Sequence, residues 1–441
     1  MIRVLAVPPF EALDPLLPRR AGSDPDTREA VRRILDDVLA RGDDAVREYT
    51  RRFDGVDLAP SDWELDAAVW QGALARLAPA LRAALGRAVD RVRAYHEHQR
   101  EPGFHLAESD GSFVGMKVTP LDRVGLYVPG GKASYPSSVV MNAVPAQVAG
   151  VQEIVAVVPP QGVTDTVLAA CALSGVTRVF RIGGAQAVAA LAYGTPTVPR
   201  VDKIVGPGNR WVAEAKRQVV GQVGIDMIAG PTEVLVIADR TARPARVAAD
   251  LLAQAEHDED AVSWCVTTDP ALAEALPAAL EEALSRAPRA AIARTALERN
   301  GLIVLVPSLR EAVEVANRRA PEHLQIVTED ADRVAQGIRH AGAIFLGDDT
   351  PEPVGDYLAG PSHVLPTSGT ARYASPLGVY DFVKRTSLIR YSRARLAEDA
   401  DAIIALAEAE GLYGHADAVR VRVAGAVPSS TSSHVLPVDA R

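Results

Sequence analysis

The segment RVGLYVP (123–129) begins the part of the sequence that decides the fold. A helical run, SVVMNAVPAQVAG (138–150), follows this strand-like run and leads to a second strand-like run, EIVAVVP (153–159). A further helical run, TDTVLAACALSG (164–175), precedes VTRVFRIG (176–183). Short β-branched runs that alternate with helical runs are typical of a parallel sheet with helices on both faces. The segment therefore predicts an α/β domain.

The same alternation continues beyond a break at GIDMIAGPTEVLV (224–236). Helical VAADLLAQAEH (247–257) and strand-like AVSWCVTT (261–268) follow the break, and the series extends to AIFLG (343–347). The series is long enough for two sheets. We therefore predict two α/β domains with mainly parallel strands.

The N-terminal part of the chain is predicted to be helical. The segments TREAVRRILDDVLARG (27–42) and PALRAALGRAVDRVRAYHEHQR (79–100) both carry apolar residues at helical spacing. His96 and His98, at the end of the second segment, are expected to be solvated. The Ser-rich end of the chain is expected to be disordered.

Composition narrows the class of protein. A chain of 441 residues is expected to form two or three domains. A formal net charge of −9 argues against nucleic-acid binding, which requires a basic patch. No apolar run is long enough to span a bilayer, and the N-terminus lacks the ordered regions of a secretory signal. Cys171 and Cys265 form no CxxC pair and are expected to be buried thiols. We expect a cytoplasmic enzyme.

Three glycine-rich segments follow predicted strands: YVPGGKASYPSS (127–138), IGGAQA (182–187) and VGPGNRW (205–211). None of them matches the G-x-G-x-x-G fingerprint of dinucleotide sites, because Trp211 stands where the third glycine would be. In an open parallel sheet these strand ends meet at the carboxyl edge, where ligands bind. We therefore expect a binding crevice, with simple tight turns as the alternative.

The segment DLLAQAEHDED (250–260) ends a predicted helix in a crowd of polar residues. Gln254 and His257 are three residues apart, so they share a helix face with roughly 5–6 Å between Cβ atoms. The pattern has two explanations, which are a metal site and a capped helix end with a solvated acidic loop.

A Glu–His pair, Glu322 and His323, lies between a predicted helix and a predicted strand, directly after Pro321. Such a pair can serve as general base and partner, because histidine titrates near neutral pH. Asp356 and His363 fall in one irregular segment. For each of these residues, a position on the surface is the alternative explanation.

Glu410 and His415 flank a helix end near the C-terminus. Together with three residues introduced above, His415 makes a nitrogen and oxygen donor set suited to Zn²⁺. The members of that set are Gln254, His257, Asp356 and His415.

Several long segments resemble the histidinol dehydrogenase family. They include GPTEVLVIAD (230–239), APEHLQI (320–326) and the run from GDYLAGPSHVLP to FVKRTSLI (355–389), besides the polar helix end at 250–260. The glycine-rich strand ends match as well. The resemblance extends from about residue 23 to residue 425. It implies NAD-dependent, zinc-dependent oxidation of L-histidinol through the aldehyde to L-histidine, in a four-electron reaction that is the last step of histidine biosynthesis.

The resemblance also implies roles for individual residues. A zinc ion in each subunit would be held by Gln254, His257, Asp356 and His415. The catalytic pair would be Glu322 and His323. Substrate contacts would come from Thr232, Gln254, His257, His323, Asp356, His363, Glu410 and His415. The NAD⁺ contacts would be Tyr127, Gln186 and Asn209, one in each glycine-rich strand end. Thr232 stands where many members carry serine, which retains the hydroxyl.

The fold implied by the family has two incomplete Rossmann-like domains, a helical N-terminal part and an extended C-terminal tail, in a domain-swapped homodimer. Glu410 and His415 would then complete the site of the partner subunit. The expected divisions are residues 1–22 (N-terminal arm), 23–126 with 234–377 (first α/β domain), 127–233 (second α/β domain, NAD-binding), 378–427 (C-terminal helical tail) and 428–441 (disordered).

Three alternatives stay open. The chain can oxidise another polar alcohol on the same fold, although Glu410 and His363 favour histidinol. It can be a zinc hydrolase, which would need no nicotinamide. It can be a non-catalytic zinc-binding scaffold, which would have no use for the pair Glu322 and His323.

Overall fold

The structure is a computed structural model that describes residues 2–6, 13, 17, 24–130 and 135–424. The expected disordered segment 428–441 and most of the expected N-terminal arm lie outside these residues. The chain forms two compact units. The first unit comprises Met1–Arg100 and Pro120–Val383, and the second comprises Glu101–Thr119 and Lys384–Arg441.

The first unit contains a five-stranded parallel sheet in the order β6-β5-β4-β7-β8. Its strands are β4 (Arg123–Tyr127), β5 (Glu153–Val157), β6 (Arg178–Phe180), β7 (Lys203–Val205) and β8 (Gly224–Ile225). The connecting elements are α7 (Pro136–Ala149), η3 (Pro160–Gly162), α8 (Asp165–Leu173), α9 (Gly184–Tyr193) and α10 (Arg210–Gln218). The chain leaves β4 toward β5 and returns to its other side at β7. The switch in strand order marks the carboxyl end of β4 and β7 as a binding crevice.

The N-terminal helices cover this five-stranded sheet. They are α2 (Pro25–Arg41), α3 (Asp43–Asp54), α4 (Ala67–Gln71), α5 (Ala73–Arg76) and α6 (Pro79–Glu97), with η2 (Pro60–Asp62) between them. Helices α2 and α3 pack on α9, α4 and α5 pack on α8, and α6 packs on α7. Val31 and Leu35 of α2 share one core with Phe180 and Ile182. The expected boundaries grouped residues 23–126 with 234–377 instead, so the structure divides the chain differently here.

His96 corrects one expectation, because its side chain is buried. It continues the apolar stripe of α6 formed by Leu85, Val89 and Val92, at the spacing of one helix face. Its Nδ1 lies 2.7 Å from the carbonyl oxygen of Val92. Helix periodicity therefore decides the burial of this histidine, whereas His98 is exposed as expected.

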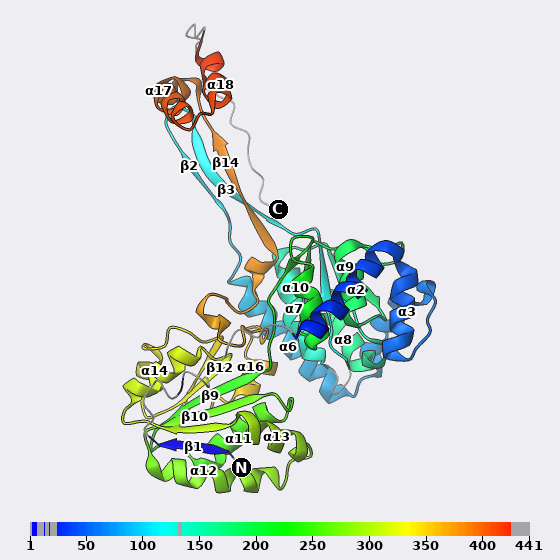
Figure 1. Ribbon diagram of the computed structural model, residues 1–441, viewed down its shortest axis with the longest axis vertical. Coiled ribbons are helices and arrows are strands. Elements are labelled where there is room, and N and C mark those ends of the chain that lie inside the picture. Colours follow the sequence, from blue (N-terminus) through cyan, green and yellow to red (C-terminus); the bar gives the residue numbers. More distant parts are fainter. Residues whose placement is uncertain (1, 7–12, 14–16, 18–23, 131–134, 425–441) are drawn as a thin grey trace. The chain divides into compact units, whose positions relative to one another are not determined.

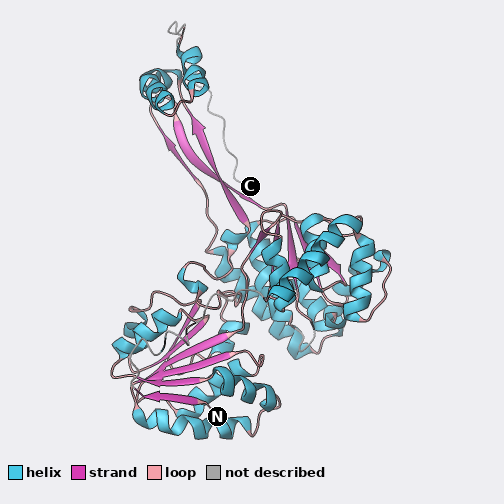
Figure 2. Cartoon of the chain, in the orientation of Figure 1, coloured by secondary structure: helices cyan, strands magenta, loops and turns pink. Residues whose placement is uncertain are grey.

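A six-stranded parallel sheet, also in the first unit, has the order β1-β11-β10-β9-β12-β13. Its strands are β1 (Arg3–Ala6), β9 (Glu233–Ala238), β10 (Val262–Thr267), β11 (Leu302–Leu305), β12 (His323–Val327) and β13 (Ala343–Leu346). Its helices are α11 (Pro244–Ala255), α12 (Pro270–Leu284), α13 (Ala290–Asn300), α14 (Leu309–Arg319), α15 (Ala331–Ala335) and α16 (Glu352–Tyr357), and η4 (Thr370–Arg372) and η5 (Val379–Asp381) follow. Figure 2 shows these strands as a fan of arrows.

Strand β9 is buried on both faces, which explains the uninterrupted apolar run after its first residue, Glu233. Successive side chains of a strand point to opposite faces, so Val234 and Val236 join one core and Leu235 and Ile237 join another. Helices α11, α12 and α13 cover the first face and α14 covers the second (Figure 1). The prediction of mainly parallel sheets between layers of helices is therefore confirmed.

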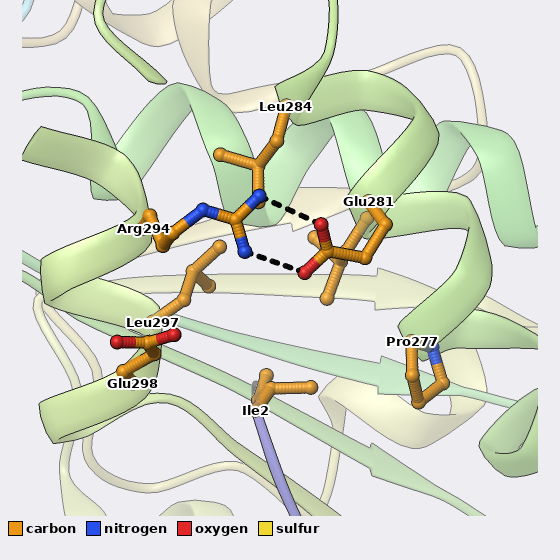
Figure 3. Close-up of a pocket in the computed structure, with 8 residues that line it drawn as sticks. Ile2, Pro277, Glu281, Leu284, Arg294, Leu297 and Glu298 are labelled. Atoms are coloured by element: carbon orange, nitrogen blue, oxygen red, sulfur yellow. Dashed lines mark hydrogen bonds and ion pairs between the residues drawn. The ribbon is translucent and has the colours of Figure 1, made fainter. Parts of the chain in front are cut away.

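Ile2, which directly precedes the edge strand β1, packs into a small site between α12 and α13 (Figure 3). Ile2 lies there beside an ion pair in which Arg294 donates two hydrogen bonds of 2.7 Å to Glu281. The cavity measures about 10 Å³, which leaves room for one water at most. This site stabilises the attachment of the N-terminal strand and is too small for a ligand.

The second unit consists of a three-stranded sheet and two helices. Its elements are β2 (Phe104–Ala107), β3 (Phe113–Pro120), β14 (Val383–Arg390), α17 (Arg393–Ala409) and α18 (Tyr413–Val423). The strand order is β14-β3-β2, and β2 and β3 form an antiparallel pair. Segments far apart in sequence are therefore joined in this unit. No helix within the described ranges combines the length and the apolar character that a bilayer crossing requires.

Candidate active site

The amino ends of β9 and β12 bring two of the expected segments together. The strands pair in parallel with His323 opposite Val234, so Thr232, Glu322 and His323 enter the sheet side by side. Helix α11 runs back across the sheet from the carboxyl end of β9, and its last turn therefore returns Gln254 to this same amino edge.

A chain of hydrogen bonds connects these residues. The Gln254 amide Nε2 donates to Thr232 Oγ1 at 2.7 Å, and the Thr232 hydroxyl donates to Glu322 Oε2 at 2.7 Å. The backbone N–H of Glu233 donates to the same carboxylate oxygen at 2.9 Å. The other atom of this amide, Oε1, is buried and has no hydrogen-bond partner among the described residues. The amide is therefore held with its oxygen available as an acceptor.

The backbone of Glu233 also fixes His323. Its carbonyl oxygen lies 3.1 Å from His323 Nδ1, which is the geometry of a donated N–H. The opposite ring nitrogen, Nε2, is then the basic atom, and it is buried without a hydrogen-bond partner among the described residues. Burial lowers the pKa of His323 to about 4, so the ring is neutral near pH 7. A neutral imidazole with a free Nε2 is ready to accept a proton.

Glu322 complements this histidine. Its carboxylate Oε2 lies 3.6 Å from His323 Nδ1. Burial raises the pKa of Glu322 well above its ordinary value, and the hydrogen bonds from Thr232 and Glu233 offset only part of that effect. A carboxylate with a raised pKa is a stronger base toward water than an exposed one. The pair therefore offers two bases of different chemistry at one place.

Three further side chains gather next to this pair. Ligand atoms of His257, Glu352 and Asp356 all lie within 4.8 Å of one another. Glu352 and Asp356 are four residues apart on α16 and therefore share a face. Oε1 of Glu352 lies 3.8 Å from His323 Nδ1, and Oε2 of the same carboxylate is buried with no hydrogen-bond partner in the described part of the chain.

Glu352 is the residue that the sequence analysis missed. It is 2% exposed, which is rare for an acidic residue without an ion-pairing cation. Its spacing from Asp356 in the segment PEPVGDY was the available signal, because two acidic residues four apart on a helix present one surface. The short helix lies in a stretch whose Gly and Pro content indicated an irregular loop.

His363 belongs to the same cluster. Burial lowers the pKa of His363, and the nearby His257 also lowers it. The charge of Asp356 raises this pKa and so opposes both effects. Nε2 of His363 is buried, and none of the residues that the structure describes forms a hydrogen bond with it. The first unit thus brings together Thr232, Gln254, His257, Glu322, His323, Asp356 and His363, all of which were expected, together with Glu352.

The other two expected residues lie in the second unit. Glu410 is the C-terminal cap of α17, and His415 lies in the first turn of α18. Both side chains are exposed. They are therefore available on the surface of the second unit.

The donor set of the first unit fits a metal ion. Gln254 presents a buried oxygen that no hydrogen bond uses, and His257 and Asp356 supply a nitrogen and a carboxylate oxygen. Nitrogen and oxygen donors of this kind suit Zn²⁺. An ion at this place would satisfy the unpaired amide oxygen, because a buried acceptor without a partner costs about 1–3 kcal/mol.

A separate cavity lies at the carboxyl edge of the five-stranded sheet. It measures about 670 Å³, a volume typical of small-molecule and cofactor sites. The residues that line it come from all three glycine-rich strand ends and from α2 and α3. They include Ala30, Arg33, Ile34, Tyr49, Arg52, Phe53, Asp54, Tyr127, Gly130, Pro159, Gln161, Gly184, Ala185, Gln186, Asn209 and Trp211. The prediction that these strand ends meet at one crevice is confirmed, although residues 131–134 lie outside the described residues.

Tyr127, Gln186 and Asn209 all line this cavity. The Tyr127 hydroxyl accepts the backbone N–H of Gly184 at 3.1 Å. Both polar atoms of the Gln186 amide are buried and have no hydrogen-bond partner within the described ranges. Asn209 Oδ1 caps α10 by accepting the backbone N–H groups of Trp211 and Val212. The N-termini of α9 and α10 follow directly, and helix N-termini attract phosphate groups. The cavity therefore fits a dinucleotide.

Comparisons with known proteins agree with this geometry. A sequence model of the family described as histidinol dehydrogenase matches residues 17–423. The chain is 52% identical over 414 residues to the histidinol dehydrogenase of Pseudomonas savastanoi pv. phaseolicola, covering 93% of this chain and 92% of that protein. It is 56% identical over 415 residues to the histidinol dehydrogenase of Burkholderia lata, covering 92% and 95%.

A solved structure is also similar over the whole chain. The crystal structure of histidinol dehydrogenase from Elizabethkingia anophelis matches with a TM-score of 0.90 and 33% sequence identity. The match covers 96% of this chain and 98% of that one. Fold and sequence therefore point to the same family.

Proposed function

This chain belongs to the histidinol dehydrogenase family, and we propose that it oxidises L-histidinol to L-histidine with NAD⁺ at a site that holds zinc. The observation that carries the proposal is the buried pair of Glu322 and His323 beside a set of unsatisfied metal donors. Such a pair is what the oxidation of an alcohol in two steps requires. A cytoplasmic location, which we expect from the composition, stays a prediction.

Zinc would be held by Gln254, His257 and Asp356 of one subunit and by His415 of a second subunit. Bound there, zinc would supply a template that orients the imidazole and amino nitrogens of the substrate, and NAD⁺ would supply hydride acceptance. Glu410 would add a negative charge beside the cationic substrate, and Thr232 and His363 would add polar contacts. Tyr127, Gln186 and Asn209 would hold the nucleotide in the 670 Å³ cavity.

His323 would act in the first oxidation. Its free Nε2 accepts the proton of the substrate hydroxyl as hydride leaves the carbon, because the Glu233 carbonyl keeps the other nitrogen protonated. The low pKa of the buried ring keeps Nε2 unprotonated near neutral pH. The products of this step would be the aldehyde, NADH and a protonated His323.

Glu322 would act in the second oxidation. Its carboxylate accepts a proton from the water that adds to the aldehyde, and the resulting hydrate can then lose the second hydride. Thr232 and the Glu233 N–H hold one carboxylate oxygen, Oε2, in a fixed position. The oxidation of the alcohol would thus use His323 as the base, and the oxidation of the aldehyde would use Glu322.

The proposed activity is tested by measuring NADH formed from a limiting amount of L-histidinol, with and without a chelator. We expect two NADH for each histidinol, loss of activity with the chelator and recovery on addition of Zn²⁺. A yield of one NADH would indicate an alcohol dehydrogenase that releases the aldehyde. An absence of NADH from the zinc-loaded protein would contradict the proposed substrate.

We also propose a homodimer in which each site is shared between subunits, and mixing two inactive variants tests it. A His323→Ala subunit and a His415→Ala subunit each lack one part of the site. If His415 acts on the partner, a mixed dimer contains one intact site, and random mixing restores about a quarter of the wild-type activity by simple statistics. Activity that stays absent in a mixed dimer would mean that His415 serves its own subunit.

A further inference from the structure

One lining residue of the 670 Å³ cavity, Asp54, has no assigned role. It is the last residue of α3, and its Oδ2 is buried without a hydrogen-bond partner among the described residues. A carboxylate at the C-terminus of a helix is unfavourable, because that end of the helix dipole is negative. Burial also raises the pKa of Asp54. The fold therefore holds an acceptor that nothing in the described chain satisfies.

The backbone around Asp54 is fixed to the carboxyl edge of the sheet. The Gln161 side chain, in the turn after β5, donates a hydrogen bond to the main-chain oxygen of Asp54. The charge of Asp54 contributes to the raised pKa of the Tyr127 phenol, which places the two side chains in electrostatic reach. Asp54 thus lies in the same part of the cavity as a residue expected to contact the nucleotide.

Dinucleotide sites discriminate at the ribose through two kinds of side chain. An acidic residue accepts hydrogen bonds from the ribose hydroxyls of NAD, whereas an arginine accommodates the 2′-phosphate of NADP. This cavity contains both kinds, because Arg33 and Arg52 also line it. The acidic residue predicts a preference for NAD, and the arginines predict a preference for NADP. The positions of these charges in the cavity decide between the two.

The arginines are engaged at the rim of the cavity. Arg33 Nε lies 3.7 Å from a carboxylate oxygen of Glu29, and its side chain is 68% exposed. The Arg52 guanidinium lies 5.3 Å from the centre of the Phe53 ring, and Arg52 is exposed. Solvent screens exposed charges, whereas the half-buried Asp54 carboxylate, with its oxygen Oδ2 buried, is screened less from a group brought beside it.

We propose that the Asp54 carboxylate accepts hydrogen bonds from the ribose hydroxyls of the bound dinucleotide and excludes a 2′-phosphate, and so selects NAD⁺ over NADP⁺. This inference rests on the proposed nucleotide site. Two negative groups in one desolvated place repel, which is a general device for specificity. With the carboxylate removed, Arg33 and Arg52 would become the nearest charges to a 2′-phosphate.

The test is equilibrium binding of NAD⁺ and of NADP⁺ to the zinc-loaded protein, followed by tryptophan fluorescence because Trp211 lines the cavity. Asp54→Asn keeps the shape of the side chain and removes its charge. We expect this variant to narrow the preference for NAD⁺ by about tenfold or more, with weaker NAD⁺ binding and stronger NADP⁺ binding. Asp44→Asn removes a charge from an exposed position on the same helix and should keep the wild-type ratio.

Two further measurements separate recognition from folding. The zinc content of Asp54→Asn should equal that of the wild type, and its melting temperature should be unchanged or higher, because the buried charge is gone. Adding Arg33→Ala and Arg52→Ala to Asp54→Asn should remove the gained NADP⁺ affinity. An unchanged NAD⁺-to-NADP⁺ ratio in a folded Asp54→Asn protein would overturn the inference alone. A wild-type protein that binds neither nucleotide would overturn the nucleotide site as well.

Discussion

The two sheets of the first unit use opposite edges and different parts of the chain. At the carboxyl edge of the five-stranded sheet, glycines and helix N-termini line an open cavity of about 670 Å³. At the amino edge of the six-stranded sheet, the half-buried Thr232 hydroxyl joins the buried side chains of Gln254 and Glu322 through hydrogen bonds. Backbone groups suit a common cofactor, whereas a dense cluster of side chains suits chemistry on one substrate.

This comparison explains why the general rule for α/β sheets applies to only one of the two. Ligands of open sheets bind at the carboxyl edge near a switch in strand order, which the five-stranded sheet obeys. In the six-stranded sheet the polar residues lie at the start of their strands, because Thr232 directly precedes β9, Glu322 directly precedes β12 and His323 is the first residue of β12. An active-site cluster can therefore form at the amino edge when a returning helix such as α11 supplies the remaining donors.

The largest expected effect comes from Glu322→Gln. Removing the base that activates water should lower the rate of the second oxidation by about 10²–10⁴-fold, while NAD⁺ binding stays the same. Rapid mixing should then show one NADH per site in a fast phase and a slow second phase. As a control, Glu329→Gln removes an exposed acidic residue just after the same strand. Equal slowing of both phases would show that Glu322 does not act specifically on the aldehyde.

An effect of intermediate size is expected from a substitution of Gly206, which follows β7 at the carboxyl edge of the five-stranded sheet. Its φ is 105°, and a Cβ there would lie 2.2 Å from the carbonyl oxygen of Tyr127. Gly206→Ala should therefore distort the nucleotide cavity, raise the Kd for NAD⁺ by about tenfold or more and leave zinc bound, because positive-φ strain and a backbone clash cost about 1–3 kcal/mol.

Gly221→Ala is the matched control for this clash. Gly221 has a similar φ of 98° but no atom within 4 Å of the added Cβ. It should lose some stability and keep its NAD⁺ affinity. Loss of zinc from Gly206→Ala would contradict the proposal that zinc binding at one edge is independent of NAD⁺ binding at the other.

The smallest effect concerns the stability of the amino edge. Burial raises the pKa of Asp250, which lies one turn before Gln254, from 3.8 to about 6. The folded state therefore holds the proton more tightly than the unfolded chain, and this stability is lost as the pH rises from about 4 to about 6. Asp250→Asn should raise the free energy of unfolding at pH 7 by about 2 kcal/mol, and should give no gain below pH 4.

Urea unfolding at the two pH values measures this difference. The exposed Asp260→Asn is a suitable control, since it changes the charge by the same amount near the end of the same helix. An equal gain at both pH values would mean that burial of the charge is not its cause. A gain at pH 7 alone would distinguish the amino edge of the six-stranded sheet, which holds an unfavourable buried charge, from the carboxyl edge of the five-stranded sheet, where glycines and helix N-termini line the cavity.

Local patterns predicted the parallel sheets and the meeting of the three glycine-rich strand ends. Alternating strand-like and helical runs carry this information within short segments, as in RVGLYVP (123–129). Both cysteines are buried and free, as expected from their apolar surroundings. Glu322, His323 and Gln254 were singled out from their sequence context and given roles by the family resemblance, and in the structure Thr232 links Gln254 to Glu322, which lies beside His323.

Long-range packing was beyond the reach of such patterns. The amphipathic helices α2 and α3 show an apolar face but not the sheet that it covers, so the sequence did not show that they pack on α9 of the five-stranded sheet. The pairing of β3 with β14 joins segments more than two hundred residues apart, as their bounds show. Glu352 was missed because its burial depends on packing of a six-residue helix against the rest of the site.

The most direct test of the division between the two edges is a paired measurement on Gln254→Ala. Zinc content and NAD⁺ affinity would be determined on the same sample, by elemental analysis and by tryptophan fluorescence. We predict that zinc is largely lost while the affinity for NAD⁺ stays within about twofold of the wild type, because the two sites share no residue. Full retention of zinc, or loss of NAD⁺ binding together with zinc, would contradict the account.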